Sequence, residues 1–208
     1  MEHKVTRSTY LAQAVSRYSN PPILSVLVLL IIACTSADNV RELVSWVTAI
    51  LLFFVLIPSV YVFLRIRSSG NRVKSVVKLT TFLKQHPGDI FILGLLSGLT
   101  CVAILSILKV PTTLISTVVA LLAVSMVTAL FNTFYRVSFH AAGITILIIM
   151  AAKSWGLVFL VLLAVLPLIF WAKYHLREHT IPQLVIGIAV AVVVGLVTLF
   201  LFGQLAVF

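Results

Sequence analysis

Long, uninterrupted apolar runs constrain the fold of this chain more than any other feature. Seven such runs cover roughly residues 21–36, 43–66, 90–108, 112–134, 140–153, 155–173 and 180–206. Apolar and polar side chains do not alternate strictly along them, so the runs predict helices rather than strands. A lipid bilayer offers the backbone no hydrogen bonds, and apolar helices satisfy the backbone internally. We therefore expect an all-α fold, a polytopic transmembrane helical bundle of six to seven spans.

The number of spans depends on three of these runs. Runs 21–36 and 140–153 are shorter than the about 20 residues of an ordinary span, so tilted, paired or partly re-entrant helices are alternatives there. Runs 140–153 and 155–173 could also form one broken helix. The sequence KSWG at 153–156 is typical of a tight interfacial turn and favours two spans.

The composition excludes a soluble domain. Hydrophobic residues make up 62% of the 208 residues, charged residues make up only 10%, and the mean hydropathy is +1.21. A soluble domain of this size could not bury so much apolar surface, so we expect residues 1–208 to form a single integral-membrane domain. Residues 1–20 are polar and basic, which argues against a cleaved signal peptide. Cys34 and Cys101 lie within apolar runs and are interpreted as packing residues, not as a disulfide or a metal site.

The cations divide unevenly between the two sides of the expected membrane. Alternation of the spans places twelve of the 15 Lys and Arg residues on the side of the N-terminus and three on the other. The twelve are Lys4, Arg7, Arg17, Arg65, Arg67, Arg72, Lys74, Lys78, Lys84, Arg136, Lys173 and Arg177, and the three are Arg41, Lys109 and Lys153. The positive-inside rule makes the richer side cytosolic, so we expect a plasma-membrane protein with a cytosolic N-terminus. The net charge of +10 is then expected to face anionic membrane phospholipids, and nucleic acid is not an expected partner.

Residues 65–89 form the one long connection between the apolar runs. Val, Leu and Phe residues are interleaved there with Lys74, Lys78 and Lys84. This pattern predicts a short basic amphipathic helix on the cytosolic leaflet, with an ordinary solvated loop as the alternative.

Prolines and small residues mark special positions inside the runs. Pro58 and Pro167 are expected to kink their helices. Gly187, Ala191 and Gly195 are spaced by four along one face, which lets a neighbouring helix approach closely. We interpret this stripe first as packing within the chain, with dimerisation as the alternative.

Two polar clusters lie between the last three apolar runs. One reads RVSFH at 136–140, and the other reads KYHLREHT at 173–180. Each precedes an apolar run and so lies at a predicted helix N-terminus, where free N–H groups and the helix dipole favour an anion. Two apolar runs separate the clusters, so the chain would cross the membrane twice between them. Both clusters are therefore expected on the same, cytosolic side. Their cations, their serine and their two helix-opening histidines predict a site that binds and cleaves a phosphate.

The spacing within these clusters resembles the type 2 phosphatidic-acid phosphatase superfamily of integral-membrane lipid phosphatases and related haloperoxidases. The family pattern has three parts: K-x6-R-P, then P-S-G-H, then S-R-x5-H-x3-D. The sequence VSFH at 137–140 matches the second part in its serine and histidine, and Lys173, His179 and Gln183 follow the spacing of the third. The first part is not recognisable, and a phenylalanine, a lysine and a glutamine replace the family's glycine, arginine and aspartate. The resemblance covers residues 112–206, the expected phosphatase-like core.

The resemblance implies catalytic roles for three side chains. His179 would attack phosphorus and form a phosphohistidine, and His140 would protonate the leaving alkoxide. Gln183 would hold the His179 ring in the place of the family's aspartate. Chemistry of this kind implies no metal and no cofactor.

Phosphate binding is implied for two further side chains. Ser138 and Lys173 would bind phosphate oxygens, and Arg136 is a candidate substitute for a cation of the missing first part. A guanidinium there would offer a planar fork that suits a phosphate. Arg177 and Glu178 keep two interpretations, a local ion pair or a substrate clamp.

The expected activity is therefore that of a phosphoric-ester hydrolase acting on lipid phosphates. Its substrate would be an isoprenoid or glycerolipid phosphate or diphosphate, held by its tail between helices at the cytosolic membrane edge. Two alternatives stay open: a degenerate family member that binds phospholipid without cleaving it, and a small lipid transporter or scramblase. The sequence shows no internal repeat of the kind that favours transport.

Overall fold

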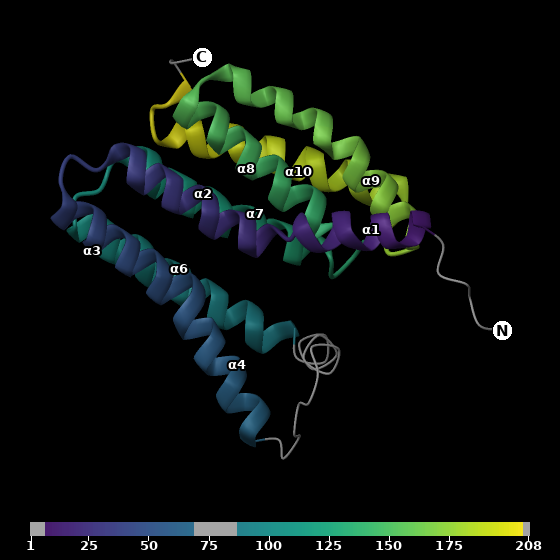
Figure 1. Ribbon diagram of the computed structural model, residues 1–208, viewed down its shortest axis with the longest axis horizontal. Helices are drawn as coiled ribbons and strands as arrows, with labels where there is room; N and C mark the ends of the chain where they lie inside the picture. Colours follow the sequence, from purple (N-terminus) through teal and green to yellow (C-terminus); the bar gives the residue numbers. More distant parts are fainter. Residues whose placement is uncertain (1–6, 69–86, 206–208) are drawn as a thin grey trace. The chain divides into compact units, whose positions relative to one another are not determined.

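The computed structural model describes residues 7–68 and 87–205, and the regular structure in these ranges is entirely helical (Figure 1). The elements are α1 (Arg7–Tyr18), α2 (Pro21–Ser36), α3 (Val40–Leu51), the π-helix η1 (Leu52–Leu56), α4 (Ile57–Ser68), α6 (Pro87–Ile107), α7 (Thr112–Phe131), α8 (Phe139–Trp155), the 3-10 helix η2 (Leu157–Val165), α9 (Leu166–His175) and α10 (Ile181–Leu201). The expected all-α fold is confirmed. Each of the seven apolar runs corresponds to one helix or to a series of consecutive helices.

Four helical stretches in the described ranges are long and apolar enough to cross a membrane. They are Val40–Arg65, Thr112–Phe131, Val158–His175 and Ile181–Leu201. Helices α1 and α2 together would make a fifth, with a bend of 46° between them. The apolar helices Phe91–Ile107 and Phe139–Trp155 are shorter. The helices are thus compatible with a membrane protein, and the six to seven spans expected from the sequence stay a prediction.

The chain divides into two compact units. The first unit combines residues 1–32 with 112–208, and the second comprises residues 33–111. The first unit therefore contains the expected 112–206 core and adds α1 and most of α2. The basic connection expected at 65–89 lies mostly outside the described residues, since 69–86 are not described.

Helices α8 and α10 approach each other closely along the stripe of small residues. A Cβ atom added at Gly187 would lie 2.8 Å from the Ser138 carbonyl oxygen, and one added at Gly195 would lie 3.1 Å from Ile146 Cδ1. Ala191, between the two glycines, is fully buried. The stripe thus serves packing within the chain, as the sequence predicts. This packing brings the start of α8 against the first turns of α10.

The other end of α10 is linked to α7 by a buried hydrogen bond. Ser116 Oγ donates to Gln204 Oε1 over 3.0 Å, and both side chains are buried. A polar side chain in apolar surroundings has few other partners, so this bond helps to fix how α7 and α10 lie against each other.

Both prolines that the sequence places inside spans coincide with a change of helix type. Pro58 follows the π-helix η1 by two residues. A proline lacks the N–H and its ring clashes with the carbonyl four residues earlier, so the wider π turn accommodates it. Pro167 is the second residue of α9 and follows the 3-10 helix η2, and the first turn of a helix tolerates proline.

Helix α1 is an element that the sequence analysis did not anticipate. Residues Arg7–Tyr18 form a helix that packs against α9, although this part of the chain is polar and basic (Figure 1). Ala12 is fully buried, and Thr9 Oγ1 lies 3.5 Å from His175 Nε2. The helix therefore reaches the end of α9, where the 173–180 cluster begins.

Candidate functional site

The 136–140 cluster is held at the start of α8 by two polar side chains. Asn132 Oδ1 accepts the Val137 N–H over 2.9 Å, and Asn132 Nδ2 donates to the Val137 carbonyl over 3.2 Å. Ser138 is the N-cap of α8, and its Oγ accepts the Ala141 N–H over 3.3 Å. Capping of this kind satisfies one of the free N–H groups at a helix start. Ser138 is fully buried, so its hydroxyl serves the helix start rather than an open surface.

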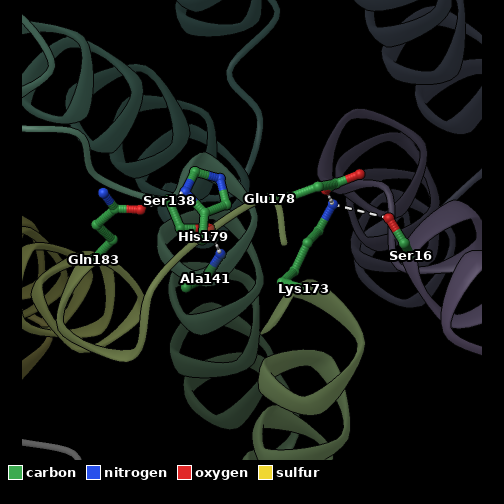
Figure 2. A network of polar contacts seen from close by, with 7 residues as sticks. All are labelled: Ser16, Ser138, Ala141, Lys173, Glu178, His179 and Gln183. Atoms are coloured by element: carbon green, nitrogen blue, oxygen red, sulfur yellow. Dashed lines mark hydrogen bonds and ion pairs between the residues drawn. The ribbon is translucent and has the colours of Figure 1, made fainter. Parts of the chain in front are cut away.

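A backbone hydrogen bond joins the two clusters. The Ser138 N–H donates to the Gln183 carbonyl over 3.2 Å, which ties the start of α8 to the first turn of α10. Figure 2 shows Ser138 and His179 together with Gln183, to which each of them is bonded. The geometry thus brings the two separated clusters to one place.

His179 and Gln183 form a pair at the start of α10. His179 Nδ1 lies 3.2 Å from Gln183 Oε1, and the same oxygen accepts the Thr180 backbone N–H over 3.1 Å. The backbone N–H needs an acceptor, which identifies this amide atom as oxygen. An oxygen that accepts can bond the ring only if Nδ1 carries the proton. The neutral His179 ring therefore keeps its lone pair on Nε2.

Lys173 is buried and already paired. Its side chain is only 3% exposed, and its Nζ donates to Glu178 Oε2 over 2.6 Å and to Ser16 Oγ over 2.8 Å (Figure 2). Ser16 belongs to α1, so the lysine bridges the 173–180 cluster and the N-terminal helix. Of the two interpretations of Glu178, the geometry favours an ion pair, and its partner is Lys173 rather than Arg177.

The environment of Glu178 favours its charged form. Burial raises the pKa of this carboxyl, but the hydrogen bond from Lys173 and the charges of Lys173, His140 and His179 outweigh burial and lower the pKa below its ordinary value. Glu178 is therefore ionised at neutral pH, and the ion pair with Lys173 is present there.

His140 is the second residue of α8 and is half-buried. Burial is the main influence on its ring, and Lys173, Glu178 and His179 are near enough to act on it electrostatically. The four side chains thus form one electrostatic group that includes both histidines of the sequence pattern.

A cavity of about 620 Å³ opens beside this group. Its lining residues are Arg136, Tyr174, His175, Arg177, Glu178, His179, Thr180 and Gln183. Arg136, His179 and Gln183 of the expected site residues line it, whereas Ser138, His140 and Lys173 do not. The side chains of Arg136 and Arg177 make no hydrogen bond or ion pair within the described ranges, so the cavity wall carries two available guanidinium groups.

Two features of this site do not follow from the sequence pattern. The Ser16 contact joins residues 157 positions apart, and no local pattern signals it. The Lys173–Glu178 pair lies across the turn that ends α9, whose geometry a periodicity argument does not give. For Arg177, the sequence offers two interpretations, an ion pair with Glu178 or a substrate clamp, and the resemblance assigns it no role.

The described residues contain no group of three or more His, Cys, Asp or Glu side chains that could hold a metal ion.

Comparisons of this chain with protein families, with curated proteins and with solved structures found no match.

Proposed function

We propose that this protein is a membrane-embedded phosphatase that acts on lipid phosphates or diphosphates. The observation that carries the proposal is the His179–Gln183 pair at the wall of a cavity that also presents two guanidinium groups with no partner among the residues that the structure describes. Gln183 holds the ring by Nδ1, which leaves Nε2 as a nucleophile. The resemblance to the type 2 phosphatidic-acid phosphatases supports the same assignment, since it gives these residues the same roles.

The reaction would proceed in two steps through a covalent intermediate. The Nε2 lone pair of His179 attacks phosphorus, and the bond from phosphorus to the leaving oxygen breaks. That oxygen belongs to the lipid alcohol of a monophosphate, or to the lipid monophosphate released from a diphosphate, and it takes a proton from His140. Water then gives a proton to the deprotonated His140 and attacks phosphorus of the phosphohistidine, and the bond between phosphorus and Nε2 breaks to release inorganic phosphate. Gln183 keeps Nδ1 oriented in both steps.

The proposed setting is the cytosolic edge of the plasma membrane. Seven spans alternating from a cytosolic N-terminus would place both clusters on the cytosolic side, together with twelve of the 15 Lys and Arg residues. The substrate tail would remain among the apolar helices while its phosphate enters the cavity. An isoprenoid or a glycerolipid meets this requirement equally well.

A second candidate function is binding of a phospholipid headgroup without cleavage. The pairing of Lys173 with Glu178 favours it, because a cation neutralised by its own carboxylate contributes little charge to a phosphoryl group. Ser138, engaged at the start of α8, likewise does not face the cavity. Binding would then depend on Arg136 and Arg177.

Turnover by the purified full chain tests the proposal. Phosphate release would be followed with phosphatidic acid and with farnesyl diphosphate, each in mixed micelles. We expect release from at least one of them, and we expect His179→Ala to abolish it without abolishing binding.

His175→Ala is the matched control, since His175 lines the same cavity. Its ring stacks on Trp171, with centroids 5.5 Å apart, and lies near Thr9, so it has a packing role. Full activity of His179→Ala would refute the nucleophile. Binding without turnover by the wild type would favour the second candidate function.

A further inference from the structure

We propose that Arg177 is a phosphate-binding residue of this cavity, in the place that the sequence pattern gives to Lys173. The inference rests on the proposed function, because it names the cation that receives the phosphate of that same site. Arg177 lines the cavity together with His179 and Arg136, and its side chain is exposed.

The backbone at Arg177 adopts a conformation that disfavours side chains. Its φ is +55°, in the left-handed region that glycine adopts at little cost. The Arg177 N–H donates to the Tyr174 carbonyl, and the Glu178 N–H donates to the Lys173 carbonyl. These two bonds form a Schellman motif that ends α9, with Arg177 at the position where glycine is usual.

Helix α10 ends with the same motif and uses the usual residue. The Gly203 N–H donates to the Phe200 carbonyl, the Gln204 N–H donates to the Leu199 carbonyl, and Gly203 has a φ of +64°. Glycine thus fits this motif in this chain. An arginine at the corresponding position of α9 keeps a strained backbone, and strain of this kind gathers at functional sites.

The end of helix α6 shows the same backbone motif at a residue that does not line the cavity. This residue is Lys109, with a φ of +54°, so a cation beside the helix C-terminus does not by itself mark a site. Lys109 lines no part of the cavity, whereas Arg177 does. Lys109 and Arg177 thus have the same left-handed backbone conformation and the same charge, and they differ in whether they line the cavity.

The charges around the cavity also favour Arg177. Lys173 is buried and bonded to Glu178 and Ser16, so a phosphate would have to displace that carboxylate to reach it. The Arg177 guanidinium has no such partner in the described ranges. A guanidinium also offers two parallel N–H groups to a phosphate, which an ammonium cannot do.

The test compares two substitutions to glycine at equivalent backbone positions. Binding of dioctanoyl phosphatidic acid to the purified full chain would be measured by titration calorimetry, with thermal unfolding measured in the same detergent. We expect Arg177→Gly to weaken binding by about tenfold to a hundredfold, the effect of one charged hydrogen-bonded pair. Lys109→Gly should leave binding unchanged. Both variants should unfold at or above the wild-type temperature, because glycine relieves the backbone strain.

Each contrary outcome has a distinct meaning. Wild-type affinity in Arg177→Gly would overturn the assignment of Arg177 and leave the proposed function standing. Equal loss of affinity in Arg177→Gly and Lys109→Gly would also overturn it, because the effect would then be general. Absence of binding by the wild type would overturn the proposed function and this assignment together. As a further check, Arg177→Lys should retain part of the affinity, since it keeps the charge and loses the fork.

Discussion

Lys173 Nζ, near the end of α9, donates a 2.8 Å hydrogen bond to Ser16 Oγ of α1, a residue 157 positions earlier in the chain. The same ammonium bonds Glu178 Oε2 over 2.6 Å. A buried ammonium without acceptors is costly, so the two oxygens stabilise both the lysine and the docking of α1. The N-terminal helix is thereby linked to the cluster that carries His179.

Replacing Ser16 by alanine tests this link. Lys173 would lose one of its two acceptors, so we expect Ser16→Ala to lower the free energy of unfolding by about 0.5–1.5 kcal/mol. Thermal unfolding in detergent would measure the change. The control is Ser106→Ala, because the Ser106 hydroxyl donates to the Val102 carbonyl of its own helix and has no other partner among the described residues. Equal destabilisation by both substitutions would show that the α1 contact contributes nothing specific.

The Lys173–Glu178 pair predicts a loss of stability in acid. The folded-state pKa of Glu178 is lowered, so the pair stabilises the protein above the ordinary glutamate pKa and is lost as the pH falls through the lower folded value. Unfolding temperatures of the wild type and Glu178→Gln would be compared from neutral pH down to about pH 3. The wild type should be the more stable at neutral pH, and the difference should shrink in acid. A difference that does not change with pH would contradict the charged pair.

The secondary structure could be predicted largely from the sequence, because apolar runs and helix-starting signals are local. The cap at Ser138 and the start of α10 after His179 follow from such signals. Helix α1 could not be recognised in the same way, since its docking on α9 depends on a distant partner. Periodic apolar residues such as Leu11, Ala12 and Val15 are a weak signal for it.

The candidate site was predicted only in part, for a related reason. Spacing alone brings His179 within reach of Gln183, four residues later on the first turn of a helix. Spacing does not reveal that Lys173 folds back onto Glu178, because that contact depends on the left-handed turn at Arg177. Charge counts place a lysine and an arginine in one cluster, but burial decides which of them is available to a ligand.

The Gln183 side chain contributes both to stability and to the orientation of His179, and substitutions can test each contribution. Its Oε1 accepts the Thr180 N–H and orients His179, so Gln183→Leu should destabilise the protein by about 0.5–1.5 kcal/mol and lower turnover. Gln183→Glu keeps the oxygen and adds a negative charge at a helix N-terminus, so it should maintain or raise both stability and turnover. Unfolding temperature and initial rate would be measured on the same preparations. Unchanged turnover in Gln183→Leu would show that Gln183 does not orient the nucleophile.

Trapping of a phosphoenzyme tests the central claim most directly. The full chain would be mixed with phosphatidic acid or farnesyl diphosphate carrying a radioactive terminal phosphate, then quenched in alkali, which preserves phosphohistidine. We predict label on the wild-type protein, its loss on acid treatment, and no label on His179→Ala. Label retained by His179→Ala, or phosphate release by the wild type without any labelled protein, would contradict the account.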